Sequence, residues 1–175
     1  DALIEKLVPR IEKLKVGPYT AGDDVDYGPV VTKAAMENIR RLVQTGIDQG
    51  AELVVDGRDF ALQGYEDGFF VGPHLFDRVT PDMDIYRTEI FGPVLSTVRA
   101  GSYEEAIGLA MDHEYGNGTA IFTRDGDTAR DFANRINIGM VGINVPIPVP
   151  LAYHTFGGWK KSGFGDLNQH GPDAF

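Results

Sequence analysis

Apolar and polar residues alternate along the chain with the periods of both helices and strands. Apolar residues recur at helical spacing in several segments, with Thr32 and Asp127 as N-caps of two of them and a capping box at Ser102 and Glu105 in another. Helices are predicted over residues 3–14, 32–50, 102–111 and 127–136. Short apolar runs predict strands at residues 52–55, 94–98, 119–122 and 140–145.

This order of elements predicts the fold class. Strands that alternate with helices of such length pair in parallel through right-handed crossovers. We therefore expect an α/β fold with a doubly wound, mostly parallel sheet and helices on both faces. Because 175 residues is the length of one domain and can bury a core, we expect residues 1–175 to form a single domain.

The composition argues against several classes of partner and site. A net charge of −10 disfavours nucleic acid and anionic membrane surfaces, which bind to basic patches. No apolar run reaches the roughly 18 residues of a membrane helix, so we expect a soluble protein. The absence of cysteine excludes disulfides and thiolate metal sites and suits a reducing compartment. The histidines His74, His113, His154 and His170 lie in separate loop or helix-end contexts without the spacing of a metal or nucleophile site, and we expect no metal.

The run from Thr88 to Val94, TEIFGPV, places an acid and an aromatic residue directly before a predicted strand. A carboxylate at Glu89 can accept two hydrogen bonds from a vicinal diol such as a ribose, and the ring of Phe91 can pack on a flat heterocycle. The alternative is a solvated surface acid beside a core phenylalanine, which is the commoner setting of each residue type. The residues alone leave both possibilities open.

The same run is part of a wider set of motifs. Gly28-Pro29-Val30 lies upstream, and Asn144 and the segment FGGWKKSG from Phe156 to Gly163 lie downstream. Together these motifs resemble the C-terminal half of an NAD-dependent aldehyde dehydrogenase, over essentially the whole chain. The methylmalonate-semialdehyde dehydrogenase branch of that family is most similar in three features: GINVPIPVP at residues 142–150, Trp159, and DLNQHG at residues 166–171.

The resemblance implies roles for a few residues. In the family, the acid that matches Glu89 bonds the nicotinamide ribose of NAD, and the aromatic residue that matches Phe91 packs near the nicotinamide. Asn144 and Phe156 match positions that line the substrate tunnel. From the residues alone, Asn144 can equally be a turn residue at a strand end, and Phe156 can be a core aromatic.

The resemblance also implies a reaction that this chain cannot complete. The family attacks its aldehyde with a cysteine thiolate, and the chain has no cysteine. We therefore expect an inactive catalytic-domain fragment with no catalytic residue of its own. Its partners would be a missing N-terminal cofactor domain and sister subunits of a dimer or tetramer. The full protein would oxidise malonate or methylmalonate semialdehyde with NAD and coenzyme A to an acyl-CoA and carbon dioxide.

Two alternatives stay open at this point. The full protein could be a hydrolytic NAD(P)-dependent aldehyde dehydrogenase of another branch, in which water replaces coenzyme A. The chain could instead be a non-catalytic interaction domain. The resemblance implies a cytoplasmic location, or the mitochondrial matrix in a eukaryote, and places the groups that bind the substrate carboxylate outside this chain.

Overall fold

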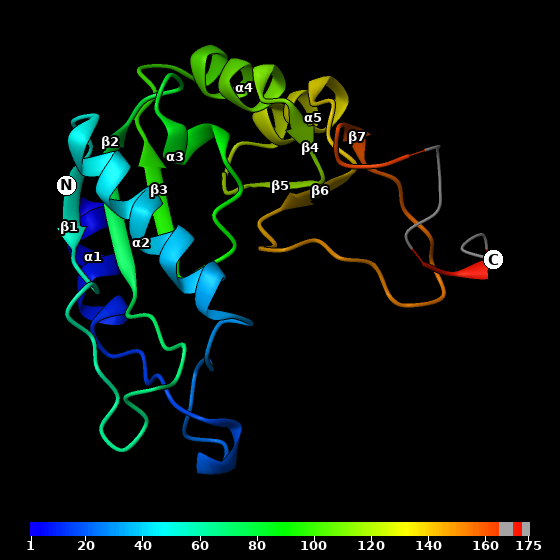
Figure 1. The fold of residues 1–175 in the computed structure, drawn as a ribbon. Coiled ribbons are helices and arrows are strands. Elements are labelled where there is room, and N and C mark those ends of the chain that lie inside the picture. The colour runs from blue at the N-terminus through cyan, green and yellow to red at the C-terminus, as the bar shows by residue number, and fades with distance from the viewer. Residues whose placement is uncertain (165–169, 173–175) are drawn as a thin grey trace. The chain divides into compact units, whose positions relative to one another are not determined.

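The chain forms two compact units, Asp1–Arg99 and Ala100–Phe175. The computed structural model describes residues 1–164 and 170–172, and Figure 1 shows the order of its elements. Both units combine helices with strands, as an α/β fold requires. The expectation that residues 1–175 act as one domain remains a prediction.

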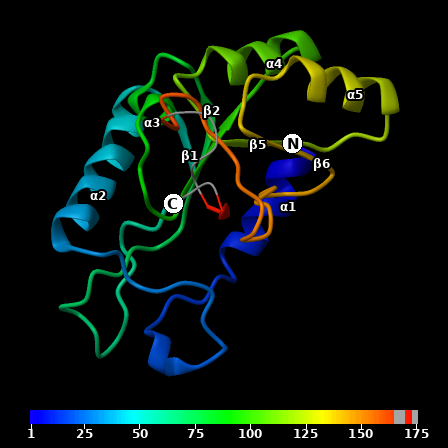
Figure 2. The same cartoon turned by 90° about the vertical axis from the view of Figure 1, so that its right-hand side faces the viewer.

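A three-stranded sheet forms the centre of the first unit. Its strands run in the order β1 (Glu52–Val55), β2 (His74–Val79) and β3 (Val94–Val98), with β1 antiparallel and β3 parallel to β2. The helices are α1 (Ala2–Ile11), α2 (Lys33–Asp48) and the short α3 (Asp84–Arg87), with a 3-10 turn at Tyr19–Ala21. Figure 2 shows α1 and α2 on opposite sides of this sheet. Helices therefore cover both of its faces, as the sequence pattern predicted.

The core of the first unit lies between α2 and the sheet. Ile39 and Leu42 on α2 and Phe76 on β2 are at most 1% exposed, and they belong to one apolar cluster. Every residue of β2 except Arg78 is buried, because the strand lies in the middle of a sheet that is covered on both faces. Full burial of one large apolar side chain contributes about 1.5–3 kcal/mol. The contact between α2 and β2 is therefore a main source of this unit's stability.

A charged network lies on β2 and the strand beside it. The buried carboxylate of Asp77 accepts hydrogen bonds from Arg99 Nε at 3.0 Å, Thr97 Oγ1 at 2.9 Å and Arg78 N at 2.7 Å. A second guanidinium nitrogen of Arg99 also pairs with Asp77, and a third bonds to Asp1. The hydrogen-bonded Arg99 guanidinium holds the pKa of Asp77 well below its usual range. Asp77 is therefore ionised although it is buried.

The second unit has two helices above two small sheets in its described part. The helices α4 (Tyr103–Asp112) and α5 (Gly126–Arg135) lie side by side in Figures 1 and 2. The strand β5 (Gly118–Ile121) pairs in parallel with β6 (Met140–Ile143), and β4 (Tyr115–Gly116) pairs antiparallel with β7 (Trp159–Lys160). The described strand pairs of the whole chain are thus parallel and antiparallel in equal number.

The helix starts follow the sequence prediction with one exception. The side chains of Thr32 and Ser102 each accept a hydrogen bond from the first turn of their helix, as predicted. The helix α5 is capped by Asp125, whose carboxylate accepts from Thr128 N at 2.6 Å, whereas Asp127 lies inside the first turn. The prediction of Asp127 as the cap was wrong, because Asp125 is the residue with the extended backbone that an N-cap requires.

The position of His74 also differs from the expectation of a loop. It is the first residue of β2 and is 1% exposed, and neither ring nitrogen bonds to another residue in the described part of the chain. Burial is the main cause that lowers the pKa of His74, so the imidazole stays neutral. A histidine that follows Gly72-Pro73 has the sequence signature of a turn, which concealed the start of the strand.

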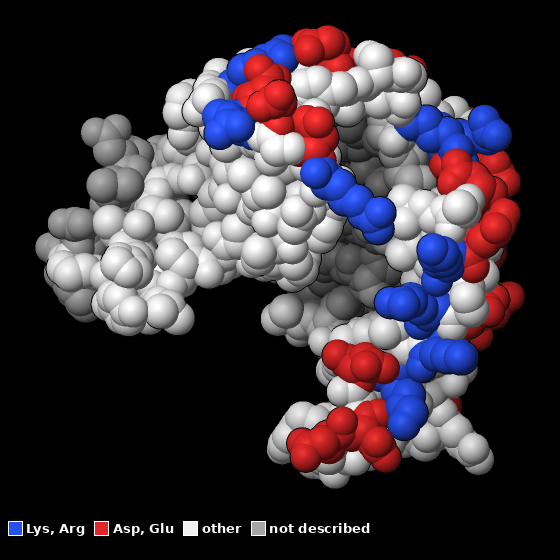
Figure 3. Space-filling model, turned by 180° about the vertical axis from the view of Figure 1, so that it is seen from behind, with Lys and Arg blue, Asp and Glu red and all other residues white. Residues whose placement is uncertain are grey.

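Charged side chains of both signs are mixed on the surface. On the face drawn in Figure 3, basic and acidic groups lie next to one another. Ion pairs such as Arg58 with Asp56 and Arg135 with Glu104 are part of this pattern. Exposed pairs of this kind contribute about 0–1 kcal/mol each, which is less than the apolar core provides. No helix within the described residues has the length and apolar character to cross a membrane.

Replacing Asp77 by asparagine should lower the free energy of unfolding by about 2–3 kcal/mol, because the Arg99 guanidinium loses its buried ionic partner. A lowered folded pKa stabilises the fold above the unfolded value of about 4, and that contribution is lost as the pH falls further. Urea unfolding of both proteins should therefore show the full difference at neutral pH and a reduced one near about pH 3, where folded Asp77 is still largely ionised and part of its contribution remains.

The matched control is Asp127→Asn, because the Asp127 side chain is 96% exposed. This replacement should change the free energy of unfolding by less than about 0.5 kcal/mol. A difference between Asp77→Asn and wild type that is the same at both pH values would contradict the ionic role of Asp77.

Candidate functional site

The TEIFGPV run forms a loop between α3 and β3, here called the α3–β3 loop (residues 88–93). At its start, Thr88 N donates to the carbonyl of the first residue of α3 at 2.8 Å. At its end, Val94 N donates to Gly92 O at 2.8 Å as β3 begins. A loop with no regular structure of its own is thus tied at both ends to regular elements.

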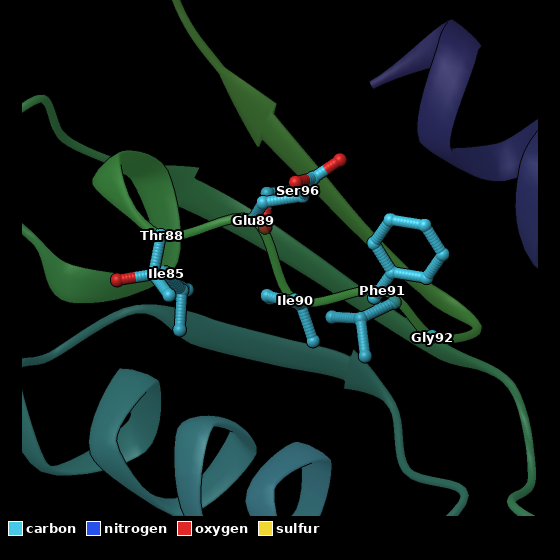
Figure 4. A pocket seen from close by; sticks show the side chains of 8 residues that line it. Ile85, Thr88, Glu89, Ile90, Phe91, Gly92 and Ser96 are labelled. Atoms are coloured by element: carbon cyan, nitrogen blue, oxygen red, sulfur yellow. The ribbon is translucent and has the colours of Figure 1, made fainter. Parts of the chain in front are cut away.

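A hollow of about 500 Å³ opens on this loop. It is lined by residues of the loop together with residues of α3 and β3: Ile85, Thr88, Glu89, Ile90, Phe91, Gly92, Val94 and Ser96. In Figure 4 the carboxyl group of Glu89 and the ring of Phe91 extend to one side of the loop, whereas Ile85 and Ile90 point to the other. Ile85 and Ile90 pack on the apolar core of the first unit. The aliphatic side chains therefore anchor the loop and leave the acid and the ring exposed.

Phe91 is held in the open by an uncommon backbone conformation. The residue is 81% exposed, and its φ angle is +56°. A residue other than glycine in this left-handed region carries a strain of roughly 1–2 kcal/mol. Strain and an exposed aromatic ring at the same residue are typical of a binding position rather than a packing position. The structure thus excludes the alternative of a core phenylalanine.

Glu89 offers an unsatisfied acceptor. The residue is exposed, and its carboxylate makes no hydrogen bond or ion pair with another residue that the structure describes. An ionised carboxylate has about four acceptor sites and no donor. It can therefore receive two hydroxyl groups of one ligand at once. Thr88 and Ser96 also line the hollow.

Asn144 has a structural role at the ends of β5 and β6. Its side-chain oxygen accepts from Thr123 N at 2.9 Å, and its side-chain nitrogen donates to Thr123 O at 3.0 Å. Its backbone is left-handed, with φ +57°, and its N–H donates to Ile121 O at 2.8 Å. This is the strand-end turn residue that the sequence allowed. A place for Asn144 in a substrate tunnel remains a prediction, and the residue lies in a different unit from Glu89.

Phe156 is half-buried and packs against the end of the chain. Its ring meets the ring of His170 edge-on, with the centroids 4.9 Å apart, and His170 Nδ1 lies 3.1 Å from Ala152 O. Phe156 is thus partly a packing residue, and its place in a substrate tunnel remains a prediction. Residues 166–169 of the tail motif lie outside the described residues.

The segment that follows Asn144 exposes an alternating apolar surface. More than half of the surface of four side chains is open to solvent: Val145, Ile147, Val149 and Leu151. The prolines between them have no N–H and cannot extend a sheet. Contiguous exposed apolar side chains usually mark a contact surface. The structure therefore makes this segment a candidate wall or interface.

The sequence did not indicate two of the residues that line the hollow. Ser96 follows Val94 by two positions on β3, so strand alternation could have placed both on one face. Ile85 lies on a single helical turn, which is too short to show a period. Within the described residues there is no group of three or more histidine or acidic side chains that could hold a metal ion.

Comparison with known proteins relates the whole chain to one family. Residues 1–175 match the model of the aldehyde dehydrogenase family. A malonate-semialdehyde dehydrogenase of Pseudomonas aeruginosa is 61% identical over 174 residues, which are 99% of this chain and 35% of that relative. A mitochondrial, acylating methylmalonate-semialdehyde dehydrogenase of Arabidopsis thaliana is 52% identical over 169 residues, which are 95% of this chain and 27% of that relative.

A solved structure gives the same result for the fold. A Sinorhizobium meliloti protein described as a methylmalonate-semialdehyde dehydrogenase, crystallised with NAD, is 72% identical and superposes with a TM-score of 0.94. The match covers 99% of this chain and 35% of that one. This similarity confirms the predicted α/β fold. The chain spans about a third of the length of the relatives it matches most closely among those named here.

Replacing Phe91 by alanine should change the free energy of unfolding by less than about 0.5 kcal/mol, because the ring is exposed. The matched replacement Phe76→Ala, at a residue that is 0% exposed, should cost about 3–5 kcal/mol. Phe91→Gly should be more stable than Phe91→Ala, since glycine adopts a positive φ without strain. Urea unfolding of the three variants measures these differences. A large loss in Phe91→Ala would mean that the ring supports the fold.

Proposed function

Because the chain belongs to the aldehyde dehydrogenase family, we propose that it forms part of an NAD-dependent enzyme that oxidises malonate or methylmalonate semialdehyde. The relatives from Pseudomonas aeruginosa and Arabidopsis thaliana, whose names carry these substrates, support the substrate class. One observation carries the site: the unpaired Glu89 carboxylate and the outward Phe91 ring share one hollow.

Glu89 and Phe91 would hold the nicotinamide half of NAD. A ribose presents two neighbouring hydroxyl donors, and the Glu89 carboxylate has only acceptors to offer. The Phe91 ring offers a flat apolar surface to the pyridine ring. A hollow of about 500 Å³ lies within the range of small-ligand sites. The Sinorhizobium meliloti relative was crystallised with NAD, which supports this choice of cofactor.

The chain would supply cofactor positioning and not the nucleophile. It contains no cysteine, and the family resemblance implies a thiolate elsewhere in the full-length protein that attacks the aldehyde carbon. NAD, when bound, accepts the hydride that leaves this carbon. A ring and a ribose held at fixed positions keep the hydride acceptor close to the reacting carbon. The isolated chain is therefore expected to be inactive.

Coenzyme A, rather than water, would take the acyl group. The name of the Arabidopsis thaliana relative specifies an acylating enzyme, and residues 142–150 and Trp159 resemble that branch. Semialdehyde, NAD⁺ and coenzyme A would give acyl-CoA, carbon dioxide and NADH. The product is acetyl-CoA from malonate semialdehyde and propionyl-CoA from its methyl homologue. The second candidate, a hydrolytic dehydrogenase, would release the free acid instead.

The rest of the full-length protein would complete the site. A cofactor domain outside this chain would bind the remainder of NAD, and sister subunits of a dimer or tetramer would cover exposed apolar surface such as that of residues 145–151. The related enzymes come from bacteria and from mitochondria, which supports the cytoplasm or the mitochondrial matrix as the location.

In the full-length protein, Glu89→Gln should weaken NAD binding roughly 10- to 100-fold, because a charged acceptor of the ribose hydroxyls is lost. The control Glu37→Gln removes an exposed acid on α2 and should leave the affinity unchanged. The isolated chain should bind too weakly to detect, since one ribose contact barely offsets the entropy of association. Calorimetric titration measures the NAD affinity of the wild type, of both variants and of the isolated chain. Wild-type affinity in Glu89→Gln would exclude Glu89 from the cofactor site.

With either semialdehyde as substrate, the full-length enzyme should form acyl-CoA and NADH in equal amounts when coenzyme A is present. Without coenzyme A the thioester has no acceptor, so NADH formation should stop after about one equivalent per active site. Absorbance of NADH and mass spectrometry of the products measure both results. Unchanged turnover without coenzyme A, with free acid as the product, would favour the hydrolytic candidate.

A further inference from the structure

Two glycine contacts join α2 to the two ends of the candidate cofactor site. A Cβ atom added at Gly92, at the end of the α3–β3 loop, would lie 2.5 Å from Ile39 Cδ1 on α2. A Cβ atom added at Gly46 on α2 would lie 2.8 Å from Ile85 Cδ1, just before the loop. Real Cβ atoms do not approach other atoms so closely, so both positions require glycine unless a neighbour moves. In each contact an isoleucine of one element fills the space above a glycine of the other.

The two contacts form one surface. Ile39 and Gly46 are seven residues apart on α2, so they lie two turns apart on the same face of the helix. Their counterparts, Ile85 and Gly92, both line the hollow that Glu89 and Phe91 share. One rigid helix therefore contacts the segment that carries the acid and the ring both before and after these residues.

Burial prevents these contacts from relaxing easily. Ile39 is 0% and Ile85 4% exposed, and both belong to the main apolar cluster of the first unit. A close-packed core resists even small changes of volume. The helix itself is long, and the side chain of Thr32 caps its start. If α2 moves toward or away from the α3–β3 loop, the loop backbone must therefore move as well.

We propose that Ile39 and Gly46 are positioning residues of the cofactor site: α2 sets the height and orientation of the α3–β3 loop, and through it the positions of Glu89 and Phe91. Neither residue touches the cofactor. The left-handed backbone of Phe91 immediately precedes Gly92, so the Ile39 contact lies one residue from the most strained point of the loop. A binding site loses affinity when its groups move by about 0.5 Å, which is the scale of displacement that a methyl group at residue 92 would force.

The test uses the full-length enzyme and compensating substitutions, and it rests on the proposed NAD site. Gly92→Ala should weaken NAD binding by roughly tenfold or more and raise KM for NAD, with a smaller effect on kcat at saturating NAD. Ile39→Val removes Cδ1, the atom 2.5 Å from the added Cβ atom, and leaves Cγ1 at 2.9 Å as a milder conflict. The double variant Gly92→Ala/Ile39→Val should therefore bind NAD at least about threefold more tightly than Gly92→Ala, because sites in contact are not additive.

A matched control separates positioning from general destabilisation. Ile107→Val removes the same atom from a residue that is 2% exposed in the core of the second unit. It should lower the melting temperature of the enzyme as Ile39→Val does, yet leave the affinity for NAD unchanged. Ile39→Val alone should weaken NAD binding a few-fold, because it loosens the support beneath Gly92. This single variant also provides the test if Gly92→Ala does not fold.

The outcomes are distinct. Wild-type affinity in folded Gly92→Ala, or a folded double variant that binds no better than Gly92→Ala, would overturn the positioning role. Equal effects of Ile39→Val and Ile107→Val on affinity would overturn it as well. A wild-type enzyme that does not bind NAD would instead reject the proposed cofactor site, and the two failures are therefore distinguishable. The reciprocal pair Gly46→Ala and Gly46→Ala/Ile85→Val should repeat the loss and the recovery.

Discussion

The packing of α2 against the sheet is the contact on which the first unit depends. Ile39, Leu42 and Phe76 are almost completely buried there, and they order a sheet of only three strands. So small a sheet gains most of its stability from the helices on its faces. The same contact fixes the distance between α2 and the α3–β3 loop. Stability and the position of the candidate site therefore have a common physical origin.

The loop can expose Glu89 and a strained Phe91 because other groups hold it in place. Ile85 and Ile90 bury their side chains in the core on one side of the loop. Local hydrogen bonds close both of its ends. Strain at a single residue persists only where the surrounding structure determines the backbone more strongly than the residue itself does. An open carboxylate and an open ring on a supported loop are thus held in place without a ligand, which would reduce the entropy lost in the proposed binding of NAD.

The sequence predicted those elements that have a clear period or a clear cap. The helix α2 and the strands β1 and β3 were found, because their apolar spacing is regular and Thr32 marks a start. The sequence did not reveal α3, β4 or β7, because α3 is a single helical turn and β4 and β7 have only two residues each. Asp125 and Asp127 are equally good caps in sequence, and only the backbone conformation distinguishes them. His74 was missed because burial depends on contacts from distant segments.

In the candidate site, too, features set by neighbouring residues could be predicted from the sequence, and features set by distant residues could not. The motif predicted that Glu89 and Phe91 belong together, since both lie on one short loop whose ends are fixed. It could not show that the loop is supported by Ile39 and Gly46, which lie about 40–50 residues earlier in the sequence and carry no chemistry of their own. For Asn144, an amide can bind a ligand or a strand end, and the two bonds to Thr123, which the sequence could not show, establish the strand-end role. A sequence motif therefore identifies the groups that face a ligand more readily than the core residues that hold these groups in position.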